Sequence, residues 1–283
     1  MLVNLSEVLN KAREGKYAVP AFDCTEDVLI RTILDTAEEK KSPVILMLLE
    51  HDLKGKGIDY ITSMIKGVES KYNIPIVMHL DHATDIEFIK KAIDYGFTSV
   101  MYDGSMLSFE ENIKNTKIVV DMAKGKGVSV EAELGHVAGK EIDGSYAGEM
   151  ALTEPSQVKE FIDRTGIDAL AVSIGTSHGV YVSMPNLNIE RLREINEIST
   201  VPLVLHGGSG TPEDQVKEAI VNGITKINLY ADLRIAMFKG LKTSCETQKR
   251  VDPLPDQVFK PVKDELRKTI IEKIQLAMSQ DRI

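Results

Sequence analysis

The sequence is poor in the features that mark secreted, membrane-spanning and nucleic-acid-binding proteins. Cys24 and Cys245 are the only cysteines among 283 residues, too few for a disulfide framework, so we expect a reducing, cytoplasmic location. No apolar run approaches the roughly 18 residues that span a bilayer, which argues against an integral membrane protein. The formal net charge of −9 argues against a nucleic-acid partner, because tracking phosphates requires clustered Lys and Arg.

The sequence also lacks a segment that would divide it into domains. No run rich in Pro, Ser or Gly, no low-complexity tract and no block of like charge interrupts the chain. Residues 1–15 have the pattern of an amphipathic helix rather than a secretion signal. Single-domain α/β barrels commonly need about 250 residues, so we expect one domain over residues 1–283.

Short apolar runs alternate eight times with longer segments of helical periodicity. The runs are almost continuously apolar, which is typical of parallel strands covered by helices. They lie at residues 18–22, 43–48, 75–80, 99–102, 128–134, 168–174, 201–207 and 225–230. Eight such units predict an α/β fold of the (β/α)8 TIM barrel type. An extra amphipathic helix, from about residue 256 to 279, follows the last unit and is a candidate for assembly.

Two of the predicted helices carry end signals that the structure can test. For the helix after the third strand, Thr84 is the predicted N-cap and Gly96 the predicted C-terminal stop. For the helix after the seventh strand, Thr211 is the predicted cap, Pro212 the first helical residue and Asp214 part of a capping box.

Three of the six histidines lie at the ends of three different predicted strands. These are His82, His178 and His206. Because the carboxyl ends of barrel strands meet at one rim, the three imidazoles should converge there and bind a catalytic zinc ion that keeps one position open. A single histidine at a strand end is more often structural, so the metal prediction depends on the three together. His79 is expected to be a hydrogen-bonded histidine inside the barrel.

A glycine-rich segment, residues 206–214, joins the seventh strand to its helix. Glycines allow backbone N–H groups to approach a ligand, and the following helix N-terminus favours an anion. Barrels often bind phosphate in the loops after strands 7 and 8, so a phosphate is predicted here.

Six segments resemble the class II aldolases, in the branch of fructose-bisphosphate and tagatose-bisphosphate aldolases. They follow the family's order along nearly the whole chain, and they are HLDHAT (79–84), VMYDGS (100–105), EAELGHVAG (131–139), GTSHGVY (175–181), LVLHGGSG (203–210) and KIN (226–228). The resemblance implies a lyase that cleaves a fructose- or tagatose-1,6-bisphosphate-like ketose into dihydroxyacetone phosphate and an aldehyde. It also implies a catalytic zinc ion, leaves room for a monovalent cation, and points to a homodimer or homotetramer.

The resemblance assigns His82, His178 and His206 to the zinc, and it makes Glu133 and Asp103 ligands in alternate or second metal positions. A divalent metal would stabilise the negative charge left on the ketose when its C3–C4 bond breaks.

Acid–base and substrate roles follow from the same resemblance. Asp81 would take the proton of the C4 hydroxyl, and Glu141 would serve as the base for the C3 proton of dihydroxyacetone phosphate. The positions that match phosphate and triose contacts are Gly179, Gly207, Gly208, Ser209 and Asn228.

Departures from the family pattern cluster on the substrate side. Asp23 replaces an asparagine, Glu50 lies in a segment that is usually small or glycine-rich, and Tyr230 and Ala231 replace a pair that ends in threonine. In the loop that carries Glu141, Ala138 replaces a glycine and Ile142 precedes Asp143.

Carboxylates at positions 23 and 50 would repel a distal phosphate. Alternative substrates are therefore ketose 1-phosphates with a sulfonated (6-deoxy-6-sulfofructose 1-phosphate), deoxy or uncharged distal end. Lys140 and Arg234 are the cations that could meet an anionic end.

Three competing functions remain at this point. A Schiff-base aldolase needs a lysine inside the barrel, and Lys226 at the start of the eighth strand is the only tempting candidate. A metal-dependent hydrolase or epimerase could use the same three histidines. A non-catalytic, aldolase-like subunit could keep the fold with a vestigial site.

Overall fold

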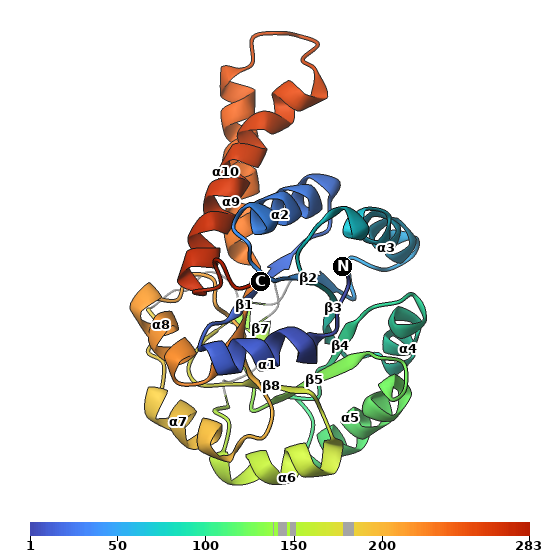
Figure 1. Ribbon diagram of the computed structural model, residues 1–283, viewed down its shortest axis with the longest axis vertical. Helices are drawn as coiled ribbons and strands as arrows, with labels where there is room; N and C mark the ends of the chain where they lie inside the picture. Colours follow the sequence, from blue (N-terminus) through green and yellow to red (C-terminus); the bar gives the residue numbers. More distant parts are fainter. Residues whose placement is uncertain (138, 141–145, 148–150, 178–183) are drawn as a thin grey trace.

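Eight parallel strands close into a barrel at the centre of the computed structural model (Figure 1), which describes all residues except 138, 141–145, 148–150 and 178–183. Around the barrel the order is β1 (Val19–Asp23), β10 (Ile224–Leu229), β9 (Leu203–Leu205), β8 (Ala169–Val172), β5 (Ser129–Leu134), β4 (Ser99–Tyr102), β3 (Ile76–Ala83) and β2 (Val44–Leu49). Every strand pair in the barrel is parallel. The predicted (β/α)8 barrel is confirmed.

Helices cover the outer face of this barrel (Figure 1). Each follows a strand, and they are α2 (Asp27–Glu39), α3 (Gly57–Val68), α4 (Ile86–Asp94), α5 (Phe109–Ala123), α6 (Pro155–Thr165), α7 (Ile189–Ile198), α8 (Glu213–Val221) and α9 (Ala231–Thr247). A 3-10 turn (Glu69–Lys71) follows α3, and β6 (Gly139–Lys140) pairs antiparallel with β7 (Tyr146–Ala147). No helix in the described part of the chain is both long and apolar enough to cross a bilayer.

One end of the barrel is plugged by α1 (Leu5–Gly15), which crosses it in Figure 1. Asn4 and Glu7 form a capping box at the start of this helix. Its buried face, which includes Leu9, packs in one apolar cluster with inward-facing residues of the barrel such as Val77 and Val204. The strands thus begin in an apolar core.

The interior becomes polar toward the carboxyl ends of the strands. Side chains on a strand point alternately inward and outward. Val77 on β3 points inward, and His79 and Asp81, two and four residues further along, therefore point inward as well. Lys226 on β10 reaches His79 and Glu131 of β5 across the barrel, which confirms that these side chains share the interior. Hydrogen-bonding groups are therefore concentrated at the end of the barrel opposite α1.

The last two helices form a hairpin that projects beyond the barrel (Figure 1). It consists of α9 and α10 (Pro255–Leu276). The extra C-terminal helix predicted from about residue 256 to 279 is therefore confirmed as α10. The two helices approach closely at Gly240, where an added Cβ would lie 2.4 Å from the Cα of Val262. The hairpin carries several exposed apolar side chains, namely Ile235, Phe238, Val251, Leu254 and Phe259.

Two predicted helix starts are wrong, whereas the predicted stop at Gly96 is confirmed by its φ of +82° just after α4. Asp85, not Thr84, caps α4, because β3 continues to Ala83 and moves the cap one residue on.

At α8 the predicted cap and capping box are also wrong. Pro212 occupies the N-cap position, helix residues begin at Glu213, and no side chain in the described chain caps this helix. The hydroxyl of Thr211 instead donates to the carbonyl of Gly207, so it stabilises the glycine-rich turn rather than the helix.

Candidate active site

Two successive residues, Asp81 and His82, turn toward the site because β3 is irregular where it ends. Its register with β4 shifts between Leu80 and Ala83, and His82 has a φ of +45°. A bulge of this kind redirects side chains that would otherwise alternate. A left-handed conformation at a non-glycine residue is strained, and such strain is typical of functional sites.

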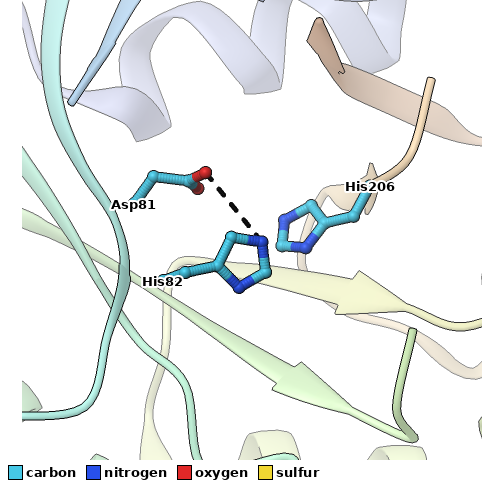
Figure 2. A group of neighbouring side chains, drawn as sticks. All are labelled: Asp81, His82 and His206. Carbon is cyan, nitrogen blue, oxygen red and sulfur yellow. Dashed lines mark ion pairs between the residues drawn. The ribbon is translucent and has the colours of Figure 1, made fainter. Parts of the chain in front are cut away.

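The imidazoles of His82 and His206 meet at the carboxyl end of the barrel. Their ring centroids lie 4.4 Å apart, and Figure 2 shows both rings beside the Asp81 carboxylate. A dashed line in Figure 2 joins Asp81 Oδ2 to His82 Nε2, which are 3.9 Å apart. His206 comes from the end of β9, on a different part of the barrel. Two of the three predicted histidines therefore converge.

In each of these two imidazoles, both ring nitrogens have a carboxylate group nearby. His82 Nδ1 lies 2.8 Å from Asp103 Oδ2, and His206 Nδ1 lies 3.0 Å from Glu133 Oε2. Asp81, His82 and His206 each offer one ligand atom within 4.8 Å of the others, as do His82, Asp103 and Glu133. Imidazole nitrogens and carboxylate oxygens at this spacing fit a divalent metal ion.

The charges at the site favour a cation. Burial acts to lower the pKa of His82, but the carboxylates of Asp81 and Asp103 outweigh burial and raise that pKa to about 10. The pKa of His206 is also raised, against burial and the charge on His82, by Glu131 and Glu133. A bound metal would replace these protons, because histidine binds metals in its neutral form.

Asp81 is buried and held by several donors. The side-chain amide of Asn228 donates to both of its oxygens, at 3.1 and 3.2 Å, and His79 Nε2 lies 3.4 Å away. Burial tends to raise the pKa of Asp81, but the charges on His82 and Lys226 and the hydrogen bond to His79 hold it well below its usual value. Asp81 therefore stays ionised and fixed in position.

A buried ionic group lies beneath Asp81 and His206. Lys226 Nζ donates to both oxygens of Glu131, at 3.0 and 2.8 Å, and both side chains are 0% exposed. His79, in the same layer, hydrogen-bonds to Ser99 at 2.8 Å, as expected of a barrel histidine. The Lys226 amine is thus enclosed and paired, which argues against the Schiff-base alternative.

The glycine-rich turn after β9 lies against β10 and the start of α9. Gly207 has a φ of +67°, and an added Cβ at Gly208 would lie 2.3 Å from Ile227 Cγ2. The backbone N–H of Asp232, in the first turn of α9, approaches Ser209 Oγ at 3.4 Å. Glycine is therefore required where the turn packs on β10, and the predicted phosphate residues lie beside the start of α9, where Ala231 is the first helical residue.

Asp23 lies at the end of β1 and is 5% exposed. Burial raises its pKa to about 8, with further contributions from Asp52 and Asp81, whereas Arg234 acts to lower it. The Arg234 guanidinium lies 5.0 Å from the centre of the Tyr230 ring. The raised pKa favours the protonated form of Asp23, which weakens the repulsion of a distal phosphate that the sequence predicted from this residue.

Several predicted residues lie outside the described part of the chain: Glu141, His178, Gly179, Ala138, Ile142 and Asp143. Conversely, the structure gives roles to residues that the sequence did not resolve. Glu131 lies in one of the family-like segments but was assigned no role, and Asn228 was assigned only as a substrate contact. The signal available for Glu131 was its spacing of two residues from Glu133, which places both side chains on one face of a strand.

Comparisons with known proteins agree with this arrangement. The profile of the family described as fructose-bisphosphate aldolase class-II matches residues 3–282. A fructose-bisphosphate aldolase of Geobacillus stearothermophilus is 41% identical over 278 residues, which cover 97% of this chain and 96% of the relative. The match extends over nearly the full length of both proteins.

Solved structures also match. The YdjI aldolase of Escherichia coli K12 has a TM-score of 0.89 and 34% identity, covering 100% of this chain and 99% of that one. A fructose-bisphosphate aldolase of Campylobacter jejuni shares the fold, with a TM-score of 0.81, 21% identity and coverage of 100% and 97%. The family profile and the 41% identical relative show that the chain belongs to the class II fructose-bisphosphate aldolase family and is a lyase.

Proposed function

We propose that this protein cleaves a ketose bisphosphate by a metal-dependent retro-aldol reaction, releasing dihydroxyacetone phosphate and a phosphorylated aldehyde. The observation that carries the proposal is the convergence of His82, His206 and Asp81 at the carboxyl end of the barrel. The 41% identical fructose-bisphosphate aldolase supports a bisphosphate over the sulfonated, deoxy and uncharged alternatives.

Zinc is the proposed metal, bound by His82, His206 and His178, the last of which lies outside the described residues. When bound, the ion would act as a Lewis acid toward the negative charge that develops on the ketose oxygens. Glu133 and Asp103 are close enough to serve as further ligands. The binding of a monovalent cation stays a prediction.

Asp81 is the proposed base for the C4 hydroxyl proton. It is ionised, it is oriented by the side-chain amide of Asn228, and it lies beside the imidazole cluster. These properties suit a group that must accept a proton from a substrate held at the metal. Glu141, the predicted base for the C3 proton, stays a prediction.

The phosphate of the triose half is proposed to bind between the turn at Gly207, Gly208 and Ser209 and the start of α9. Helix N-termini favour anions, and α9 begins at Ala231 against this turn. Gly179 is a further predicted contact. The distal phosphate is proposed to lie toward Asp23 and Arg234.

We also propose that the chain works in the cytoplasm as a homodimer or homotetramer. Both cysteines are free thiols, which suits a reducing compartment. The exposed apolar side chains of the α9–α10 hairpin, among them Phe238 at 71% exposure, support a role for the hairpin in assembly.

Replacing Asp81 by alanine tests the proposed chemistry. We expect turnover of fructose or tagatose bisphosphate to fall at least about 100-fold, as for the loss of a positioned general base, while bound metal stays near one ion per chain. The panel should include the corresponding monophosphates and a sulfonated ketose phosphate. Asp163→Ala, at an exposed carboxylate paired with Lys159, is the control and should keep full activity. Normal cleavage by the Asp81 variant would show that its assigned role is wrong.

A further inference from the structure

The pairing of Lys226 with Glu131 is not explained by stability. Both side chains are fully buried, and removing two charges from water is costly. Well-packed apolar residues of similar size are often equally or more stabilising at such positions. The inward-facing residues nearer α1, such as Val77 and Val204, show that this barrel does pack apolar side chains in its interior. A buried ion pair in the next layer therefore calls for another role.

The contact that suggests this role is with His206. Glu131 Oε1 lies 3.0 Å from His206 Nε2, and the same carboxylate takes two hydrogen bonds from Lys226. An ammonium group only donates hydrogen bonds, so it favours the carboxylate form of Glu131, which only accepts. The proton between Glu131 and His206 therefore belongs to the imidazole Nε2.

With its proton on Nε2, the imidazole of His206 presents Nδ1 as the nitrogen that can bind a metal. That nitrogen faces the cluster, 3.0 Å from Glu133 Oε2. At His82 the arrangement is reversed: Nδ1 contacts the carboxylate of Asp103, and Nε2 points toward Asp81. A carboxylate thus fixes the orientation of each ring, as is common for metal-binding histidines.

We propose that Lys226 and Glu131 are positioning residues, which act together to hold His206 as the Nε2–H tautomer so that Nδ1 binds the metal. Lys226 acts through Glu131, and neither residue touches the substrate. The inference rests on the proposed function, because that proposal makes His206 a ligand. It adds that the metal affinity of the site depends on a buried lysine that binds no metal itself.

Metal affinity measured by competition with a chromogenic chelator tests this proposal without relying on turnover. Glu131→Gln and Lys226→Met keep the size of the side chains, and each should raise the dissociation constant for zinc about 10- to 100-fold. In the double variant the dissociation constant should rise by less than the product of the two single factors, because both residues act on the same ring.

Ser99→Ala is the matched control, since it removes another buried hydrogen bond in the same layer without a contact to His206. We expect it to lower the melting temperature but to leave the zinc dissociation constant unchanged. If Glu131→Gln and Lys226→Met likewise change only the melting temperature, the pair is structural and the inference is wrong.

Nitrogen NMR of histidine-labelled, zinc-loaded wild-type protein tests the tautomer even if the variants fail to fold. His206 should show a protonated Nε2 and a metal-bound Nδ1, and binding through Nε2 would overturn the proposal. A wild-type chain that binds no zinc would contradict both the inference and the proposed function. Normal zinc binding that the variants leave unchanged would contradict the inference alone.

Discussion

The two ends of the barrel interior differ sharply although the same strands build both. At the end covered by α1, inward-facing residues such as Val77 and Val204 pack with Leu9 in an apolar cluster. Further along the same strands, the inward positions are occupied by His79, Asp81 and His206, which are buried and hydrogen-bonded or paired with charged groups.

This difference shows how the fold separates stability from chemistry. The apolar end holds the strands in register without needing charged groups. The polar end buries several ionisable side chains, which favours catalysis and binding over stability. The same division is general in barrels of this type, where active sites occupy the carboxyl ends of the strands. Substitutions at the two ends should therefore affect different quantities.

The largest effect is expected at the polar end. His206→Ala should remove a proposed metal ligand and reduce turnover by about 10³-fold or more, since a catalytic metal contributes several kcal/mol to charge stabilisation. Metal content and turnover should fall together. The free energy of unfolding of the metal-free protein should change little. A loss of activity with normal metal content would show that His206 does not act through the metal.

At the apolar end, Leu9→Ala should act on stability. Leu9 is fully buried between α1 and the barrel interior, and such a truncation costs about 2–5 kcal/mol of the free energy of unfolding. Denaturant titration should show a lower midpoint, and the folded variant should keep its turnover and metal affinity. A loss of turnover comparable to that of His206→Ala would mean that the two ends are not separate.

The smallest effect is expected at the edge of the site, from Gly208→Ala. The added methyl group would lie 2.3 Å from Ile227 Cγ2 and 2.9 Å from the carbonyl oxygen of Asn228, so the turn must shift. We expect KM for the ketose bisphosphate to rise about tenfold, which corresponds to about 1.4 kcal/mol, with metal affinity unchanged. An unchanged KM would remove this turn from the proposed phosphate site.

The fold and the site differ in how far the sequence predicts them. Eight apolar runs separated by helical periodicity are sufficient to predict the barrel, because each unit buries its apolar face in the same way. The N-cap at Asp85 was missed because β3 runs on through Ala83, and local capping preferences do not show where a strand ends.

The site was predicted where it depends on strand ends and missed where it depends on contacts across the barrel. His82 lies at the end of β3 and His206 directly follows β9, so their convergence could be expected. The bulge that turns both Asp81 and His82 inward has no clear signature in the sequence. The pairing of Lys226 with Glu131 joins residues 95 positions apart in the chain, and it emerges only from the packed barrel.

Metal removal tests the central claim most directly. The unmodified protein would be stripped with a chelator, assayed for cleavage of fructose and tagatose bisphosphates, and assayed again after one equivalent of zinc is restored. If His82 and His206 bind the ion on which the reaction depends, activity disappears with the metal and returns with it. Full turnover by metal-free protein would contradict the account.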